Sequence, residues 1–165
     1  MTPQILKWLG TVRDRFVPSP GKVLEVGSLD VNGSPRSVLE EVCVGYVGID
    51  MQEGRGVDLI LDGERAAHRF GTGSFDTVVC CECLEHTIRP WWVVDSMRLA
   101  VRRGGTLIVT TPTFGFPLHR YPIDCYRFGE DAYRLWLFAG MEILDLVELK
   151  DDLGQPCLAG AARMK

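Results

Sequence analysis

The chain lacks the features that mark membrane-spanning, secreted and fibrous proteins. Its 165 residues contain no internal repeat and no apolar run near the roughly 18 residues that a membrane span requires. The N-terminus has no basic segment leading into an apolar stretch, so we expect no secretory signal. Eighteen basic residues stand against 22 acidic ones, and this net charge of −4 disfavours nonspecific nucleic-acid binding. We therefore expect a cytoplasmic protein with neither a membrane nor a nucleic acid as partner.

The six cysteines match neither a disulfide framework nor a zinc motif. One candidate zinc set comprises Cys80, Cys81, Cys83 and His86. Adjacent residues on a strand point to opposite faces, so Cys80 and Cys81 cannot easily share one tetrahedral ion. We expect buried free thiols and no metal site.

Length and composition favour one globular domain. Hydrophobic residues make up 46% of the chain and charged residues 24%, which excludes intrinsic disorder. A chain of this length buries roughly 70% of its unfolded surface around a single core. We expect one domain over residues 1–165, with a helix and linker at 1–20 and a core of sheet and helices at 21–165.

Short apolar runs bounded by turn residues predict seven strands. They alternate with helical patterns, which favours an α/β fold with a doubly wound, mixed sheet. The last two runs flank the turn Asp151–Gly154 and predict a closing antiparallel hairpin. The expected strands are Lys22–Val26, Tyr46–Asp50, Val57–Leu61, Phe75–Cys81, Thr106–Thr111, Met141–Leu149 and Pro156–Met164.

Apolar residues at helical spacing predict four helices between these strands. Thr2 is the expected cap of the first helix, and Gly104-Gly105 is the expected end of the third. The expected helices are Ile5–Phe16, a helix that begins at Ser34, about Pro90–Arg103, and Glu130–Ala139.

Acidic residues and glycines follow the first three predicted strands. In a doubly wound sheet the ligand sits at the carboxyl ends of the strands, near the point where the strand order reverses. Asp50 ends the second strand, where a carboxylate can accept two hydrogen bonds from a ribose, and Asp62-Gly63 follows the third. Gly27 lets the backbone approach a ligand closely. The alternative is that these acids only cap strand ends, but two acids at successive strand ends favour a nucleotide site.

The charges discriminate between a dinucleotide and an adenosyl cofactor. A pyrophosphate site needs a Gly-x-Gly-x-x-Gly turn at a helix N-terminus, and no middle glycine stands between Gly27 and Gly33. Asp30 lies inside this loop and Glu25 precedes it. These carboxylates would repel a pyrophosphate and attract an ammonium or a sulfonium. The charges therefore favour S-adenosylmethionine over NAD.

A family resemblance extends over residues from about 22 to 165. The stretches that carry it are Val23–Ser34, Tyr46–Met51, Asp62–Glu64, Ser74–His86, Gly104–Ile108 and His119–Phe128. In their order and spacing they resemble class I S-adenosylmethionine-dependent methyltransferases of the small-molecule group, methyltransferase type 11. The resemblance implies a Rossmann-like fold and a single methyltransferase domain.

The resemblance also implies a cofactor site. Glu25 would orient the methionine ammonium, Asp50 would hold the ribose, Met51 would pack on adenine, and Asp62 would meet the exocyclic amine. One departure is Leu29, which replaces the usual middle glycine of the first loop. The implied cofactor-binding residues are Glu25, Gly27, Ser28, Asp50, Met51, Asp62, Gly63 and Cys81.

The acceptor side is expected in the aromatic segment Phe114–Phe128, which follows the fifth strand. It is similar to a His-x-x-Pro-x-Asp-x-x-Arg pattern of relatives linked to sugar and polysaccharide methylation. We expect His119 to be the catalytic base and Asp124 to orient its ring. The alternatives are that Asp124 and Arg127 only pair to pin the loop, and that His119 only binds substrate or packs beneath it.

These observations predict methyl transfer to an oxygen or nitrogen atom of a small molecule, with a sugar or glycan as one candidate. The chain lacks the Asn/Asp-Pro-Pro-aromatic motif of base-methylating enzymes, and its one Pro-Cys pair, Pro156-Cys157, lies in the last strand. The alternatives are a non-catalytic cofactor-binding subunit of a partner protein and an NAD-dependent oxidoreductase. A homodimer or an association with a partner subunit is compatible with this interpretation.

Overall fold

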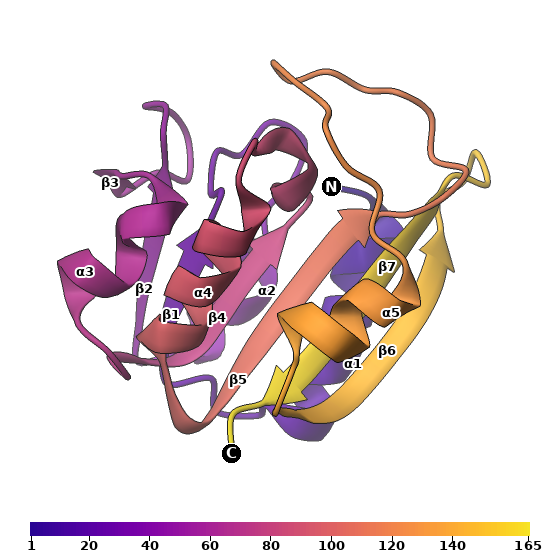
Figure 1. Cartoon of the computed structure of the whole chain (residues 1–165). Coiled ribbons are helices and arrows are strands. Elements are labelled where there is room, and N and C mark those ends of the chain that lie inside the picture. The colour runs from indigo at the N-terminus through magenta and orange to yellow at the C-terminus, as the bar shows by residue number, and fades with distance from the viewer.

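Seven strands form one mixed sheet that runs through the protein (Figure 1). The strands are β1 (Lys22–Val26), β2 (Gly45–Asp50), β3 (Leu59–Ile60), β4 (Phe75–Cys81), β5 (Val101–Pro112), β6 (Glu142–Lys150) and β7 (Pro156–Arg163). The computed structural model describes residues 1–165. The strand order is β3-β2-β1-β4-β5-β7-β6, with β7 antiparallel to both of its neighbours and the other pairs parallel. This topology confirms the predicted Rossmann-like sheet with its C-terminal hairpin.

Helical segments connect the strands on both faces of the sheet (Figure 1). The α-helices are α1 (Pro3–Phe16), α2 (Arg36–Leu39), α3 (Ala66–Phe70), α4 (Pro90–Ala100) and α5 (Glu130–Ala132). Three short 3-10 segments and one π-helical segment complete the set: η1 (Glu40–Val42), η2 (Gly63–Arg65), η3 (Leu84–His86) and η4 (Tyr133–Leu137).

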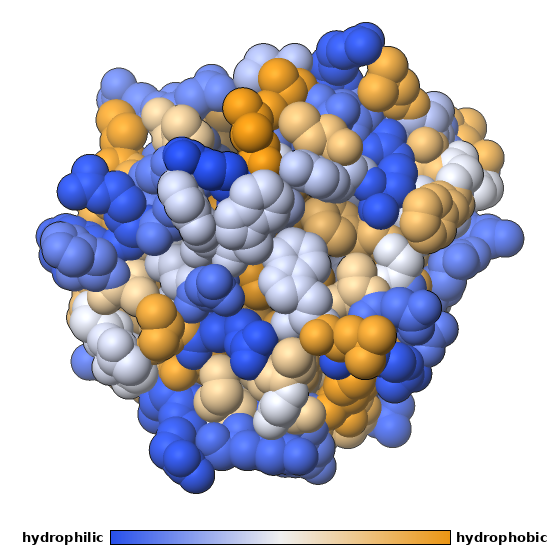
Figure 2. Space-filling view, viewed as in Figure 1, coloured by the Kyte–Doolittle hydropathy of each residue, from blue (hydrophilic) through white to orange (hydrophobic).

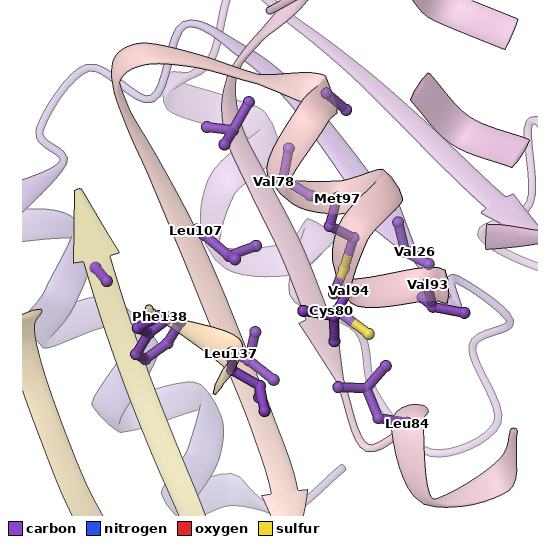
Figure 3. Packing of buried hydrophobic residues seen from close by; sticks show 14 of the residues in the cluster. Val26, Val78, Cys80, Leu84, Val93, Val94, Met97, Leu107, Leu137 and Phe138 are labelled. Carbon is purple, nitrogen blue, oxygen red and sulfur yellow. The ribbon is translucent and has the colours of Figure 1, made fainter. Parts of the chain in front are cut away.

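Two core clusters, one on each face, hold the sheet between its helices. Because side chains alternate along a strand, Val78 and Val79 of β4 belong to different clusters. Val79 packs in the cluster that contains Leu9 of α1. Val78 packs in the cluster that contains Met97 of α4 and Leu107 of β5 (Figure 3). Burial on both faces explains why the central strands have continuous apolar sequences.

The first helix begins as the sequence predicts. The Thr2 hydroxyl accepts a hydrogen bond from the backbone N–H of Ile5 at 3.4 Å, and Pro3 occupies the first turn. The indole N–H of Trp8 donates to Asp145 of β6 at 2.8 Å, which ties α1 to the edge of the sheet. The expected helix over Ile5–Phe16 is confirmed.

The prediction around Gly104-Gly105 is wrong. Helix α4 ends at Ala100, and β5 begins at the next residue, so the glycine pair lies inside a strand. Gly104 has a φ of +74°, and the register of β4 against β5 shifts between Phe75 and Thr77. A Cβ on Gly105 would lie 2.6 Å from the carbonyl oxygen of Asp76. The glycines therefore permit an irregular, close strand pairing and do not end a helix.

Four further elements differ from expectation. β3 has two residues where the sequence predicts Val57–Leu61, and the short helix α3 was not expected. The predicted helix over Glu130–Ala139 is one α-helical turn followed by π-helical η4. The helix expected from Ser34 begins at Arg36, although the Ser34 hydroxyl accepts a hydrogen bond from the Arg36 N–H at 3.0 Å.

No helix combines the length and the apolar character needed to cross a membrane. On the face seen in Figure 2, hydrophobic residues form several small groups separated by hydrophilic ones. Scattered groups of this kind are ordinary for a protein surface.

Candidate active site

A cavity of about 580 Å³ opens at the carboxyl ends of β1, β2 and β4. The segment between β5 and α5 arches over this edge of the sheet (Figure 1), and Phe116, His119 and Tyr121 of that segment form part of the cavity wall. Ligand cavities in proteins usually measure about 300–1,000 Å³. Of the predicted site residues, the wall contains Glu25, Gly27, Asp50, Met51, Asp62, Gly63, Cys81 and His119.

Glu25 is the buried acid at one end of the cavity, with 2% of its surface exposed. The Ser34 hydroxyl donates to its two oxygens, which lie at 3.0 and 3.1 Å, and the Tyr46 hydroxyl donates at 2.7 Å. Burial raises the pKa of Glu25 to about 7, and the bonds from Tyr46 and Ser34 oppose this shift. The carboxyl group is fixed in position, and a cation beside it would stabilise its ionised form.

Asp50 and Asp62 lie at the ends of the next two strands, as predicted. Asp50 accepts hydrogen bonds from the backbone N–H groups of Leu29 at 3.2 Å and Gln52 at 3.0 Å. Asp62 accepts from the N–H of Glu64 at 3.0 Å and thereby caps η2. Both acids thus organise loops, as the capping alternative expects, and both also face the cavity.

Two glycines of the wall are needed for close packing. Gly27 has a φ of +78°, and a Cβ there would lie 2.5 Å from the Cys83 Sγ. A Cβ on Gly63 would lie 2.7 Å from a methyl group of Val26. The turn after β1 therefore depends on a residue without a side chain.

Two other residues do not take the places expected from the sequence. Ser28 lies outside the cavity wall; it is buried, and its backbone N–H donates to the Ile49 carbonyl at 3.0 Å. Asp30 is also absent from the wall: its carboxylate accepts from the Gly33 N–H at 2.7 Å and pairs with Arg55 at 3.0 Å. The acidic residues of the cavity wall are instead Glu25, Asp50, Asp62, Glu82 and Asp151.

The cysteines of β4 lie on opposite faces of the sheet. Cys80 belongs to the core cluster on the α4 side and Cys81 to the cluster on the α1 side. Burial raises the pKa of the Cys81 thiol, which keeps it protonated. Cys81 is therefore an uncharged, small wall residue, and it cannot share a metal ion with Cys80.

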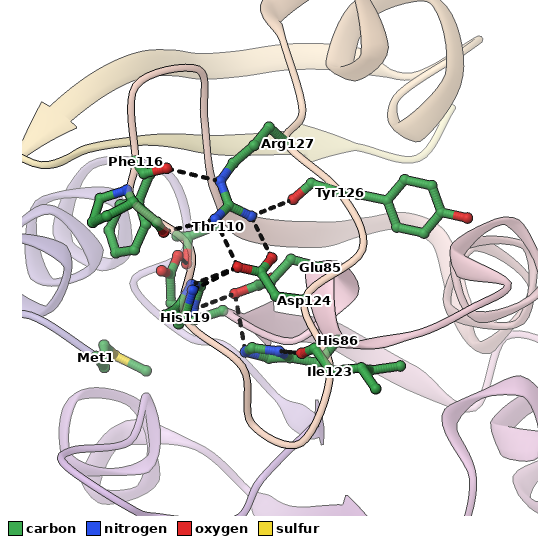
Figure 4. Close-up of polar contacts among 12 residues, drawn as sticks. Met1, Glu85, His86, Thr110, Phe116, His119, Ile123, Asp124, Tyr126 and Arg127 are labelled. Atoms are coloured by element: carbon green, nitrogen blue, oxygen red, sulfur yellow. Dashed lines mark hydrogen bonds and ion pairs between the residues drawn. The ribbon is translucent and has the colours of Figure 1, made fainter.

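His119 faces the cavity from the arching segment, with Asp124 behind it (Figure 4). Its Nδ1 lies 3.3 Å from an Asp124 oxygen, and its backbone N–H donates to the same oxygen at 2.7 Å. Glu85 raises the pKa of His119, and its nearer oxygen lies 3.7 Å from Nε2. The Asp124 side chain is 1% exposed and does not reach the cavity wall.

Asp124 also pairs with Arg127, as the alternative interpretation expects. Arg127 binds both Asp124 oxygens and lowers the pKa of that carboxyl well below its usual range. Its guanidinium also donates to the carbonyls of Phe116 at 3.2 Å and Pro117 at 2.7 Å. The ion pair therefore pins the segment and leaves Asp124 in contact with His119.

Three site residues after β4 were not selected from the sequence as functional. Glu85 is completely buried and neither of its oxygens has a hydrogen-bond donor. Burial, followed by repulsion from Glu85, raises the pKa of Glu82 to about 8. The Nδ1 of His86 lies 2.5 Å from the Ile123 carbonyl oxygen. Glu82 fits the rule that selected Asp50 and Asp62, an acid directly after a strand.

The comparisons with known proteins identify the family. A family model described as a methyltransferase domain matches residues 24–109. The chain belongs to the methyltransferase domain family. This match confirms the resemblance to class I methyltransferases and, with it, S-adenosylmethionine as the cofactor. No curated protein matches the chain.

Solved structures with the same fold as this methyltransferase-family chain share little sequence with it. A Burkholderia thailandensis 1,6-didemethyltoxoflavin-N1-methyltransferase, crystallised with 1,6-didemethyltoxoflavin and S-adenosylhomocysteine, superposes with a TM-score of 0.79 at 14% identity, over 98% of this chain and 78% of that one. The N-methyltransferase NodS from Bradyrhizobium japonicum WM9, in complex with S-adenosylhomocysteine, superposes with a TM-score of 0.70 at 16% identity, over 96% of this chain and 85% of that one. The [4+2]-cyclase SpnF superposes with a TM-score of 0.72 at 16% identity, over 96% of this chain and 81% of that one. At these identities the likeness shows the fold alone.

Proposed function

We propose that this chain transfers a methyl group from S-adenosylmethionine to an oxygen or nitrogen atom of a small molecule. The observation that carries the proposal is one cavity with several acids, among them the buried Glu25, at its strand-end side and His119 on its opposing segment. The two methyltransferases named above support it, because their structures hold S-adenosylhomocysteine.

The residues of the strand-end side fit the cofactor. Glu25 is held by Ser34 and Tyr46 and is suited to the cofactor's ammonium group, while Asp50 is suited to the ribose hydroxyls. Met51, with 70% of its surface exposed at the rim, would pack on adenine, and Asp62 would accept from the exocyclic amine. When bound, the cofactor supplies a methyl group on a sulfonium.

The arching segment would bind and deprotonate the acceptor. In its neutral form with the proton on Nδ1, which lies 3.3 Å from an Asp124 oxygen, His119 would use Nε2 to take a proton from the acceptor. Asp124 acts as a positioning residue, and Arg127 keeps it ionised. Because the thioether leaves as a neutral group, placing the acceptor atom in line with the methyl supplies much of the acceleration. A cavity of about 580 Å³ limits the bound groups to a small molecule or one end of a chain such as a glycan.

The direct test is a screen of small-molecule acceptors with the purified protein and S-adenosylmethionine, with S-adenosylhomocysteine release as the readout. We expect multiple turnovers with an acceptor that carries a hydroxyl or an amine. Tight binding of S-adenosylhomocysteine without turnover on any acceptor would favour the non-catalytic subunit instead. Nicotinamide reduction coupled to oxidation of an alcohol would favour the oxidoreductase.

A further inference from the structure

Three metal-ligating side chains meet at the acceptor side of the cavity. The atoms that could coordinate an ion belong to Glu85, His86 and His119, and all lie within 4.8 Å of one another. The nearer Glu85 oxygen is 3.6 Å from the Nε2 of His86 and 3.7 Å from the Nε2 of His119. Figure 4 shows the carboxylate between the two rings, with one histidine from η3 and the other from the arching segment.

The other ring nitrogen of each histidine faces an acceptor. The Ile123 carbonyl can only accept, so the Nδ1 of His86, at 2.5 Å, carries a proton. The Nδ1 of His119 faces an Asp124 oxygen at 3.3 Å. With both rings neutral and protonated on Nδ1, each Nε2 has a lone pair and lies within 3.7 Å of a Glu85 oxygen. His86 has the arrangement of metal-binding histidines, in which the second nitrogen donates to a carbonyl or a carboxylate; the Nδ1 of His119 lies beside a carboxylate without a hydrogen bond to it.

Glu85 supplies an independent observation. Its side chain is 0% exposed, and neither oxygen has a hydrogen-bond donor. Buried carboxylates are normally hydrogen-bonded, paired with a cation, or bound to a metal. Both imidazoles are too far away for a hydrogen bond, because 3.6 and 3.7 Å exceed the usual limit. A positive charge between the three groups would satisfy all of them at once.

We propose that Glu85, His86 and His119 bind a divalent first-row transition-metal ion. Two imidazole nitrogens and one carboxylate oxygen form a ligand set known for zinc and for related ions. Bonds of about 2.1 Å place tetrahedral ligand atoms about 3.4 Å apart, close to the two separations from Glu85. Because His86 and His119 both line the cavity, the remaining position would face the acceptor. The expectation of no metal considered a cysteine-centred set and did not include Glu85 or His119.

Metal binding has a consequence for the proposed function, although it does not depend on that function. The Nε2 of His119 cannot hold a metal ion and accept a proton at the same time. If His119 is the base, an occupied site suppresses methyl transfer and a chelator restores it. If turnover requires the metal, the ion site stands and the role of His119 as free base fails.

The test is titration of the EDTA-treated full chain with Co²⁺ and Zn²⁺, without cofactor or acceptor. We expect one saturable equivalent by calorimetry, a visible Co²⁺ spectrum, and a higher Tm with Zn²⁺. Loss of a residue that only supports a metal ligand typically weakens metal binding about 10–100-fold, and His86→Gln should weaken it by more than this because it removes a ligand. The exposed His68, on α3, gives a matched control: His68→Gln should bind as the wild type does.

Two further variants separate this site from other metal-binding groups. Cys83→Ser should leave the affinity unchanged, and Glu85→Gln should abolish saturable binding in a chain whose circular dichroism matches the wild type. If Glu85→Gln does not fold, the metal affinity of His86→Gln tests the site instead. The proposal is overturned if the wild type shows no saturable binding, if His86→Gln binds normally, or if Cys83→Ser loses the ion. None of these results depends on methyl transfer.

Discussion

At the scale of single residues, the burial of the site groups governs their chemistry. Glu25 and Glu85 are buried acids and Glu82 is partly buried, all in or beside one cavity, and desolvation raises the pKa of Glu25 to about 7 and that of Glu82 to about 8. Asp124 is equally inaccessible, but the Arg127 guanidinium lowers its pKa. A carboxyl that has a cationic partner stays ionised. A buried carboxyl without such a partner is stabilised in its ionised form when a cation binds beside it.

His119→Ala tests the base at this scale. The variant loses the only group that we assign to proton removal, so turnover should fall by roughly 10²–10⁴-fold. The affinity for S-adenosylhomocysteine should stay nearly unchanged, because Asp124 and His119 lie on the acceptor side. Steady-state kinetics with an acceptor from the screen and calorimetry measure the two effects. Full turnover in the variant, with His68→Ala as the control, would exclude His119 as the base.

Glu25 predicts a pH dependence of cofactor binding. Its pKa of about 7 in the folded protein lies above its ordinary value of 4.5, so its ionised form is scarce at low pH. This shift stabilises the free protein below pH 4.5, and the contribution is lost as the pH rises through about 7. Binding of a cationic ammonium favours the ionised carboxyl and therefore strengthens as the pH rises.

Between about pH 5.5 and 7, the affinity for S-adenosylhomocysteine should rise by up to about tenfold per pH unit. Glu25→Gln cannot ionise, so its affinity should be weaker at pH 7 and should lack this slope. Calorimetry at several pH values measures both proteins. An equal slope in Glu25→Gln would assign the dependence to another group.

At the scale of elements, the sequence predicts those parts whose signal is local. The strands β1 and β4 and the helix α1 have apolar patterns with clear ends, and their bounds agree with expectation. The helix α3 has five residues, too few for helical periodicity to be visible. The pair Gly104-Gly105 has the chemistry of a helix end, and only its pairing with β4 shows that it belongs to a strand.

The same limit applies to the site. Asp50 and Asp62 follow their strands directly, so the strand-end rule finds them. Glu85 becomes notable only when the arching segment brings His119 within 3.7 Å of it, a contact between residues far apart in the chain. The lack of a hydrogen-bond donor for Glu85 is likewise a property of the packing and has no local sequence signal.

The turn after β1 gives a prediction at the element scale. Gly27→Ala places a Cβ 2.5 Å from the Cys83 Sγ at a φ of +78°, and it should destabilise the protein by about 1–3 kcal/mol. Gly10→Ala is the matched control, because Gly10 lies in α1 with no heavy atom within 4 Å of the added Cβ. It should stabilise the protein by about 0.5–1 kcal/mol. Urea unfolding measures both changes, and a neutral Gly27→Ala would show that the turn tolerates a side chain.

At the scale of the whole molecule, the fold divides the cavity into two sides of different origin. The strand-end side comes from β1, β2 and β4 and from the loops that follow β1, β2 and β3, and the core clusters on both faces fix the position of these strands. The acceptor side comes from η3 and the arching segment, which Arg127 pins by its bonds to Asp124, Phe116 and Pro117. The strand-end side corresponds to the part of the chain that the family model matches, and the arching segment lies beyond it. Cofactor binding should therefore be separable from acceptor chemistry.

The acidic strand-end side predicts which nucleotide the molecule binds. Glu25, Asp50 and Asp62 line it, so S-adenosylhomocysteine with its ammonium should bind and NAD with its pyrophosphate should not. Asp50→Ala should weaken S-adenosylhomocysteine binding by about 1.5–3 kcal/mol, the range for hydrogen bonds to a charged group. Asp95→Ala removes the same charge from an exposed position on α4 and should leave the affinity unchanged. Calorimetry on the three proteins measures these differences. Tighter binding of NAD than of S-adenosylhomocysteine would refute the cofactor assignment, and an unchanged affinity in folded Asp50→Ala would remove Asp50 from the site.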